Sequence, residues 1–483
     1  MSISSTVKTI QDIMRKDVGV DGDAQRIGQL VWMIFSKIYD DREYEYELLE
    51  EDYISPIPER LRWRDWAADP EGITGEELLD FINNDLFKTL KNLSIAEGSD
   101  PRGFVVRDVF EDAHNYMQSG QLLRQVINKI DEIDFNLSED RHLFGDIYEQ
   151  ILRDLQSAGN YGEFYTPRAV TQFIVDIIDP KLGEKILDPA CGTGGFLTCS
   201  IEHIRSQYVE NSDDERLLQD SIFGVDKKPY PHLLCLTNMV LHGVEVPSNI
   251  KRDNSLSRPL RDYGAKDRVD VVVTNPPFGG MEEDGIENNF PASYRTRETA
   301  DLFLLLIVQL LKDGGRAGMV LPDGSLFGTG IKTRIKERLL KECNLHTIVR
   351  LPKGVFNPYT SIKTNLLFFN KGEPTKEVWY YEHTYPPDYK SYSKTKPIRI
   401  EEFDLEKKWW GDRSESENAW KVSLEAIIES DYNLDVKNPN KAEIAYEEPD
   451  VLLARYKELL DDLAGVRELL RNELTNALAR KRT

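Results

Sequence analysis

The chain has 483 residues, and its 61 Lys and Arg against 84 Asp and Glu give a formal net charge of −23. That charge argues against a chain that binds nucleic acid unaided, because phosphate contacts need Lys and Arg. A hydrophobic fraction of 40% excludes wholesale disorder. No apolar run approaches the ~18 residues of a membrane span. The four cysteines show no CxxC spacing and the seven histidines form no HExxH motif, so we expect a cytoplasmic protein without a metal site.

The first segment, residues 1–155, is predicted to form an all-helical domain. One apolar stripe at helical spacing consists of Ile27, Leu30, Val31, Ile34, Phe35 and Ile38. Further amphipathic stretches predict helices at 76–92, 104–118, 121–132 and 143–156. The acidic run at 40–52 is interpreted as a solvated face.

The second segment, residues 156–372, alternates short β-branched runs with helical patterns. Strands are predicted at 184–188, 221–226, 268–275, 316–322, 346–352 and 365–371. Helices are predicted at 196–209, 233–243, 302–315 and 332–342. This alternation predicts an α/β fold with a mixed, mostly parallel sheet.

The third segment, residues 373–483, begins with an aromatic, loop-like stretch and ends in a helix. The apolar stripe of that helix is Leu452, Tyr456, Leu459, Leu463, Val466, Leu470 and Leu474. A stripe of this kind near a terminus packs either on its own domain or on a partner.

A glycine-rich loop, LDPACGTGGF, joins a predicted strand to a helix. Gly192, Gly194 and Gly195 leave backbone N–H groups open to a ligand. Ligands of an open α/β sheet bind beyond the carboxyl ends of its strands, where Asp188 suits a cationic amine. The loop is not GxGxxG, which weakens a dinucleotide interpretation.

Acidic and amide side chains follow the next strand and the apolar segment after it. Asp226 ends the strand SIFGVD and can accept hydrogen bonds from both hydroxyls of a ribose. Asp253 or Asn254, in KRDNSL, can accept from the amino group of an adenine; the sequence does not choose between them.

The sharpest motif is Asn275-Pro276-Pro277-Phe278 at the end of the strand VDVVVT. The prolines stop the strand and fix its carbonyl groups. An exocyclic amine has two hydrogens, which Asn275 Oδ1 and the Pro276 carbonyl can accept. Phe278 offers a face on which a base can stack. These four residues are the predicted catalytic group.

A further helix start is predicted in GEFYTPRAV. Thr166 suits the N-cap and Pro167 the first helical position, so the N–H groups there would suit a carboxylate.

Three motifs in this order, FYTP, DPACGTGGF and NPPF, resemble the N6-adenine DNA methyltransferases of the gamma arrangement. More specifically, other segments resemble the modification subunit of type I restriction-modification systems: LFGDIYEQIL (143–152), ADLFLL with LLKDGGRAGMVLPDGSLF, RLPKGVFNPYTSIKTNLLFF (350–369), SYSKTKPIR (391–399) and DYNLDVKNPN (431–440). The N-terminal QRIGQLVWMIFSKIYDDRE is similar to the helical domain of that family. The resemblance covers nearly the whole chain and implies a Rossmann-like methyltransferase domain with a C-terminal helical tail.

The resemblance also implies residue roles. The methionine end of the cofactor would be lined by Glu163, Phe164, Tyr165, Thr166, Pro167 and Arg168. The cofactor loop would be Gly192, Thr193, Gly194 and Gly195, with Asp226 on the ribose. The family often has Glu where Asp226 stands and Tyr where Phe278 stands; both replacements keep the essential chemistry.

The implied reaction moves a methyl group from S-adenosyl-L-methionine to N6 of an adenine that has left the DNA stack. The methyl is already electrophilic, so no nucleophilic cysteine is needed, and Cys191 is interpreted as a packed side chain. An amino-methyltransferase acting on RNA or on protein glutamine, or one from another phage-defence system, is the alternative.

The same resemblance implies partners: a specificity subunit that reads the double-stranded DNA, with two copies of this chain per specificity subunit, and a restriction subunit. The resemblance explains how a chain with a net charge of −23 can act on DNA, because the specificity subunit reads the DNA sequence in its place. Basic clusters at 332–342 and 390–399 are interpreted as solvated faces, and the C-terminal stripe as a docking helix. The polar loop at 281–300 either closes over the site or has no role.

Overall fold

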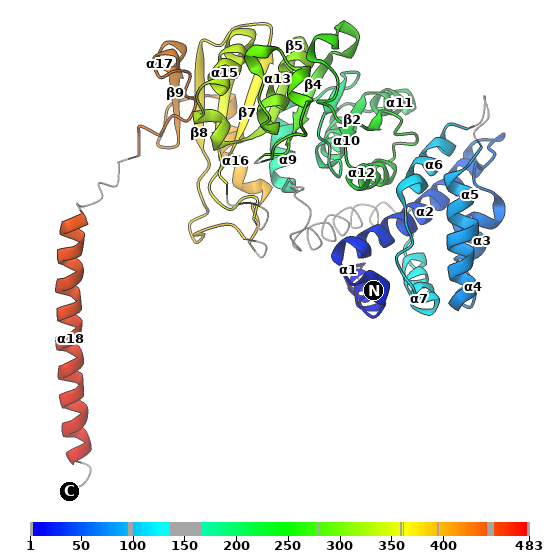
Figure 1. Cartoon of the computed structure of the whole chain (residues 1–483), viewed down its shortest axis with the longest axis horizontal. Helices are drawn as coiled ribbons and strands as arrows, with labels where there is room; N and C mark the ends of the chain where they lie inside the picture. The colour runs from blue at the N-terminus through cyan, green and yellow to red at the C-terminus, as the bar shows by residue number, and fades with distance from the viewer. Residues whose placement is uncertain are drawn as a thin grey trace. The chain divides into compact units, whose positions relative to one another are not determined.

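The computed structural model describes residues 3–94, 100–135, 166–278, 280–357, 360, 362–393, 396–441 and 449–480 (Figure 1). The chain divides into two compact units, Met1–Lys437 and Asn438–Thr483. In the described parts of the chain, no helix is both long and apolar enough to cross a membrane.

The N-terminal part of the first unit is helical, as predicted, and α2 is its central helix. The helices are α1 (Ile3–Met14), α2 (Asp23–Leu49), α3 (Trp63–Trp66), α4 (Gly75–Asp80), α5 (Phe87–Lys91), α6 (Arg102–Asp112) and α7 (Gly120–Asp131). All six residues of the predicted apolar stripe on α2 are buried, and so is Trp32, whose ring meets Phe87 edge-on at 5.0 Å. The helix predicted at 104–118 is shorter than expected, and the one predicted at 143–156 lies outside the described residues.

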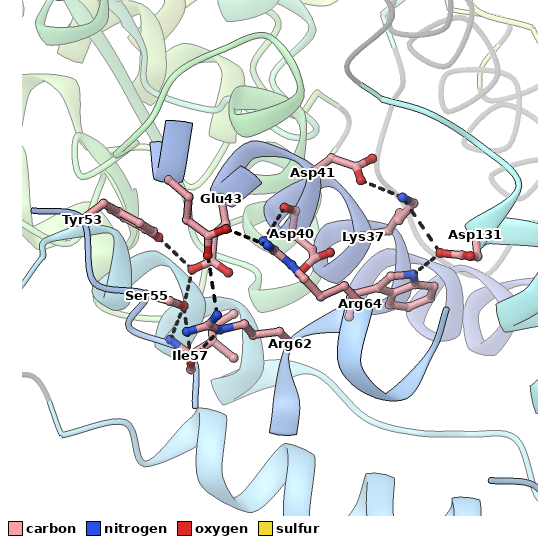
Figure 2. A network of polar contacts seen from close by, with 12 residues as sticks. Lys37, Asp40, Asp41, Glu43, Tyr53, Ser55, Ile57, Arg62, Arg64 and Asp131 are labelled. Atoms are coloured by element: carbon pink, nitrogen blue, oxygen red, sulfur yellow. Dashed lines mark hydrogen bonds and ion pairs between the residues drawn. The ribbon is translucent and has the colours of Figure 1, made fainter. Parts of the chain in front are cut away.

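The acidic run at 40–52 is not simply the solvated face that its charge predicts. Asp40 and Glu43 are buried, and burial raises the pKa of both carboxyls. Arg64 Nε donates to Asp40 Oδ1 at 2.9 Å, and Tyr53 Oη donates to Glu43 Oε1 at 2.7 Å (Figure 2). Buried carboxylates persist only with such partners, so this part of the run holds the helical domain together.

The described residues that follow the helical part, between Ile186 and Ser423, form one nine-stranded sheet of order β3-β2-β1-β4-β5-β7-β6-β8-β9. The strands are β1 (Ile186–Asp188), β2 (Ile222–Asp226), β3 (Ile250–Arg252), β4 (Val269–Thr274), β5 (Leu311–Pro322), β6 (Cys343–Arg350), β7 (Thr364–Lys371), β8 (Glu377–Glu382) and β9 (Ala419–Ser423). β1 to β5 pair in parallel, whereas β7 is antiparallel to both neighbours. The predicted mixed, mostly parallel sheet is confirmed.

The helices of this part are α9 (Arg168–Ile178), α10 (Gly195–Tyr208), α11 (Ser212–Asp220), α12 (Pro229–Leu241), α13 (Thr299–Leu310), α14 (Asp323–Phe327), α15 (Ile331–Glu342), α16 (Asp404–Gly411) and α17 (Leu424–Glu429). α9 packs on α10, and α13 packs on α15. The strand order reverses at β1 and β4, and the carboxyl ends of such neighbouring strands open a crevice for ligands.

The helix predicted at 302–315 is wrong at its end. α13 stops at Leu310, and β5 begins at Leu311. Gly314 and Gly315, where the predicted helix was expected to stop, instead make an irregularity in β5 beside β4. A Cβ on Gly315 would lie 3.0 Å from the Asp270 carbonyl oxygen, so the strands approach closely only because this residue is glycine.

The aromatic stretch after residue 372 is more ordered than the sequence predicts. It contains β8, α16, β9 and α17, and β8 pairs with β6, so the sheet continues to Ser423. The second unit contains α18 (Pro449–Arg480), the predicted C-terminal helix. The domain boundaries at 155 and 372 stay a prediction.

Candidate active site

The glycine loop connects β1 to α10 through backbone conformations that favour glycine. Gly192 and Gly194 have φ angles of 52° and 83°. A Cβ on Gly194 would lie 2.9 Å from Cys235 Sγ, whereas a Cβ on Gly192 would meet no atom within 4 Å. The loop is therefore packed on α12 at Gly194 and open at Gly192.

Asp226, at the end of β2, is held by backbone amides on both carboxylate oxygens. Gly192 N donates to Oδ2 at 3.0 Å, and Lys228 N donates to Oδ1 at 2.9 Å. Because each carboxylate oxygen has more than one acceptor site, a ligand hydroxyl can still bind there. These two backbone amides fix the orientation of the Asp226 carboxylate beside the glycine loop.

Asp253 and Asn254 follow β3 and differ in how their side chains are used. Asp253 N donates to the Asp226 carbonyl at 3.0 Å, and the Asp253 side chain is exposed. The Asn254 amide accepts from Leu256 N at 2.9 Å and donates to Glu282 Oε2 at 3.4 Å. Asp253 Oδ1 also accepts from Asn254 N at 2.7 Å, so both side chains shape the turn, but the exposed Asp253 carboxylate keeps further acceptor sites for a ligand.

Asp188 lies under the loop with 1% of its surface exposed. Its Oδ1 accepts from Thr274 Oγ1 at 2.6 Å and from Ala190 N at 3.0 Å. Burial, with a smaller contribution from the charge of Asp226, raises the pKa of Asp188 to about 7. The carboxyl is poised to lose its proton near neutral pH, and a cationic neighbour would favour that loss.

Asn275 follows β4 and has one satisfied and one unsatisfied end. Its Nδ2 donates to Thr166 Oγ1 at 2.8 Å. Its Oδ1 is buried and has no hydrogen-bond partner among the residues that the structure describes. A buried acceptor without a partner costs about 1–3 kcal/mol, and here, on a residue that lines a cavity, this oxygen is free to accept from a donor that a ligand brings.

The rest of the NPPF motif is packed to different degrees. Pro276 is buried and Pro277 is exposed. Phe278 is 3% exposed, and its ring meets that of Phe356 edge-on at 6.1 Å. A base can stack on Phe278 only after the side chains that cover it move aside.

The start of α9 differs from the prediction. The N-cap is Pro167, no side chain caps the helix, and the first helical residue is Arg168. Thr166 is therefore not the N-cap, because its hydroxyl accepts from Asn275 instead. Arg168 donates to Thr198 Oγ1 at 2.9 Å and to the Glu202 carboxylate at 2.5 Å on α10. Glu163, Phe164 and Tyr165 lie outside the described residues.

One cavity of about 240 Å³ brings most of these strand ends together. The predicted residues that line it are Gly192, Asp226, Asp253, Asn254, Asn275 and Pro277. Asp188, Thr193, Gly194, Gly195, Pro276 and Phe278 lie behind or beside this lining. No three His, Cys, Asp or Glu side chains of the described residues are grouped so as to hold a metal ion.

Part of the lining consists of residues that the sequence motifs do not predict: Lys227, Lys228, Pro231, Met281, Glu282 and Phe303. Glu282 is 4% exposed, and Lys227 Nζ donates to its Oε2 at 3.2 Å. Glu282 N also donates to the Arg297 carbonyl at 2.8 Å. These bonds pin the polar loop at 281–300 to the cavity rim. The only available signal was the position of Lys227 directly after Asp226.

The basic helix α15 is only partly the solvated face that its charge predicts, because Lys341 is exposed whereas Lys332 and Arg338 are half-buried in ion pairs. Its ion pairs are Lys332–Glu298, Arg338–Glu342 and Lys341–Glu337. Lys336 is buried and donates to the Leu326 and Gly328 carbonyls at 2.7 and 2.9 Å. Burial lowers the pKa of Lys336 to about 8.

This sheet order, with an acidic residue closing β2 and an asparagine and two prolines closing β4, defines the Rossmann-like methyltransferase class. The N-6 DNA Methylase family profile matches residues 139–448, and the HsdM N-terminal domain profile matches residues 3–130. The methylase subunit of the type I restriction enzyme EcoEI from Escherichia coli is 62% identical over 486 residues, which cover 99% of each chain.

Solved structures agree. A modification subunit of a proposed type I restriction enzyme from Vibrio vulnificus YJ016 is 48% identical with a TM-score of 0.83, over 92% of this chain and 98% of that one. A chain from a type I restriction-modification system, studied for complex assembly and conformational transition, is 38% identical with a TM-score of 0.80 over 98% and 99%. The chain therefore belongs to the N-6 DNA methylase family, among the methylase subunits of type I restriction enzymes. The resemblance and the adenine-N6 DNA methyltransferase activity predicted from the sequence are confirmed.

Proposed function

We propose that the chain transfers the methyl group of S-adenosyl-L-methionine to N6 of a flipped adenine in double-stranded DNA, within a complex whose specificity subunit reads the sequence. The observation that carries this proposal is Asn275 Oδ1, a buried acceptor without a described partner on a residue that lines the cavity. An exocyclic amine is the donor that this atom lacks.

The cavity fits the nucleoside end of the cofactor. Asp226 would accept from the ribose hydroxyls, because its two oxygens are already aligned by backbone amides. Asp253 would accept from the adenine amino group, since the Asn254 amide is engaged in its own turn. Pro231 and Phe303 supply apolar surface for the base. Asp188, whose pKa is about 7, would meet the amine of the methionine end.

The chain aligns the two reactants and provides no nucleophile of its own. The cofactor, when bound, supplies an electrophilic methyl group. Asn275 Oδ1 and the Pro276 carbonyl would accept the two N6 hydrogens and direct the nitrogen lone pair toward the methyl. These hydrogen bonds strengthen as the nitrogen becomes tetrahedral and gains positive charge, which lowers the barrier.

Cys191 takes no chemical part. A hydrogen bond with Cys235, together with burial, raises the pKa of the Cys191 thiol well above its ordinary value. The group stays a neutral thiol and packs in the loop, which supports a direct transfer without a covalent intermediate.

The partners follow from the charge and from the family. A net charge of −23 and an internally paired α15 leave this chain poorly suited to bind DNA by itself. We infer that a specificity subunit supplies sequence reading, with two copies of this chain on it, and that a restriction subunit joins the same complex. A cytoplasmic location stays a prediction.

α18 is the proposed docking helix for the specificity subunit. Exposed apolar residues follow one another along it: Leu453, Tyr456, Leu459, Leu460, Leu463, Val466, Leu469 and Leu470. Truncation after Asp450 should abolish co-purification with the specificity subunit and leave cofactor binding intact, as measured by calorimetry. Retained co-purification would contradict this role.

The proposed function is tested by transfer of a labelled methyl group to DNA that holds the cognate site. We expect N6-methyladenine only when the specificity subunit is co-expressed. Transfer by the isolated chain would mean that a DNA-binding face exists within it. No transfer in the assembled complex, despite cofactor binding, would contradict the function.

A further inference from the structure

The side-chain amide of Asn275 is held by a residue far away in the sequence. Asn275 Nδ2 donates to Thr166 Oγ1 at 2.8 Å, across 109 positions of the chain. Thr166 directly precedes Pro167, the N-cap of α9, and no side chain caps that helix. The Thr166 hydroxyl therefore serves Asn275 and not its own helix.

The backbone around Asn275 is already fixed without this bond. Thr274 is buried, and its hydroxyl donates to the buried Asp188 at 2.6 Å. Pro276 follows, and its ring fixes its own φ and restricts the backbone of the residue before it. The freedom that remains to Asn275 lies in its side-chain torsions.

Thr166 restrains those torsions: in this structure its hydroxyl accepts from Nδ2, so Oδ1 is the end of the amide turned away from Thr166. The amide group is planar, so fixing Nδ2 also fixes the direction of Oδ1. Oδ1 is the buried atom without a described partner. A half-turn of the amide would place its two N–H donors against an amine that also donates, and the target hydrogen bond would be lost.

Thr166 is itself held in place from the cofactor side. Two residues after it, Arg168 donates to Thr198 and Glu202 on α10. α10 begins at Gly195, directly after the glycine loop. α10, the start of α9 and the end of β4 are thus linked through side-chain hydrogen bonds.

We propose that Thr166 is a positioning residue for adenine methylation: its hydroxyl holds the Asn275 amide with the acceptor oxygen toward the target amine. The inference rests on the proposed function. It differs from the family resemblance, which assigns Thr166 to the lining of the cofactor. Thr166 acts through Asn275 and needs no contact with either reactant.

The test compares Thr166→Val with Thr166→Ser in the complex with the specificity subunit. The valine variant removes the hydroxyl at nearly constant volume, and the serine variant keeps it. Thr171→Val is the matched control, because Thr171 is a buried threonine of α9 whose hydroxyl donates within the helix, to the Arg168 carbonyl at 2.9 Å. Single-turnover methyl transfer at saturating cofactor and DNA is measured beside the cofactor Kd.

We expect Thr166→Val to lower the transfer rate by about 10²-fold, as small misplacements of a reacting group do. Its cofactor Kd should match that of the wild type, Thr166→Ser should restore the rate, and Thr171→Val should leave it unchanged.

Two results would overturn the inference. One is a wild-type transfer rate in Thr166→Val. The other is a raised cofactor Kd with a normal rate at saturation, which would return Thr166 to the cofactor. An inactive wild-type complex would instead refute the proposed function, and it would be seen before any variant is compared.

Discussion

The ends of β2 and β4 lie at one edge of the same sheet, yet their polar side chains differ in how far the protein satisfies them. Asp226 accepts backbone amides on both oxygens, whereas Asn275 Oδ1 is buried without a described partner. In the proposed function, the satisfied carboxylate is a rigid part of the cofactor site before any ligand binds. The unsatisfied oxygen is then the acceptor that the target amine would complete.

The largest effect on methyl transfer is expected at Asn275, whose Oδ1 is unsatisfied. Asn275→Ala removes the acceptor for the target amine, so the transfer rate should fall by about 10²–10³-fold, as when one preorganised transition-state contact is lost. The cofactor Kd should stay unchanged. Single-turnover transfer and calorimetry on the assembled complex measure the two quantities.

The control for this variant is Asn289→Ala. Asn289 Nδ2 donates to the Leu256 and Ser257 carbonyls at 2.9 Å, outside the cavity lining. It should transfer methyl groups at the wild-type rate. Equal losses in both variants would mean that the Asn275 effect is structural.

Substitution of Asp226, whose carboxylate is satisfied, should change the cofactor Kd and not the transfer rate. Asp226→Asn puts an N–H₂ group against the amide of Gly192 or Lys228, so one alignment bond becomes a repulsion. Hydrogen bonds to charged groups contribute about 1.5–3 kcal/mol, which corresponds to a cofactor Kd raised about 10- to 100-fold. The rate at saturating cofactor should approach that of the wild type. An unchanged cofactor Kd in Asp226→Asn would contradict the contrast between Asp226 and Asn275.

Two glycines of the same loop, Gly192 and Gly194, allow a matched pair of variants. Gly192→Ala and Gly194→Ala both place a side chain at a positive φ, but only the second meets Cys235 and Met239. The free energy of unfolding should therefore drop by about 1–3 kcal/mol more for Gly194→Ala. Urea unfolding measures it, and equal losses would contradict the packing at Gly194.

The smallest effect concerns pH. The pKa of Asp188 is raised from 3.8 to about 7, mainly by burial. A cationic amine binds the ionised form, so cofactor affinity should rise with pH and level off above 7, about tenfold weaker at pH 6 than at pH 8. The free energy of unfolding of the protein without cofactor depends on pH in the opposite direction. Because Asp188 keeps its proton to a higher pH in the folded state than in the unfolded state, stability falls as pH rises between 3.8 and 7.

Calorimetry at the two pH values measures the cofactor dependence. Asp188→Asn should flatten the profile, since it cannot ionise. A flat profile in the wild type would place the amine elsewhere.

The sequence predicted what depends on local pattern. β-branched runs gave β1, β2 and β4 to β7, whereas the short strand β3 was not predicted. The motifs put Asp226 and Asn275 at strand ends, where one cavity joins them with Asp253. Local rules failed where a distant partner decides. Thr166 suits an N-cap, but Asn275 takes its hydroxyl from 109 positions away.

The same limit explains two other misses. Gly314 and Gly315 read as a helix stop until the closeness of β4 is known. Glu43, in a run of charges, looks solvated until Tyr53 and Ser55 fold over it. Contacts between segments set these outcomes, and a single sequence does not display them.

The most direct test of the central claim is a cycle between Asn275 and the amino group of the target base. Binding of the assembled complex is measured with S-adenosyl-L-homocysteine and with DNA that carries adenine or purine at the target. Adenine and purine differ in the free energy needed to flip them out of the duplex. This difference is the same for the wild type and for Asn275→Ala, so it cancels in the comparison. A hydrogen bond between the two groups predicts that the preference for adenine falls by about tenfold in the variant, near 1.4 kcal/mol of coupling. The same preference in both proteins would contradict the assignment of Asn275 Oδ1 to the target amine.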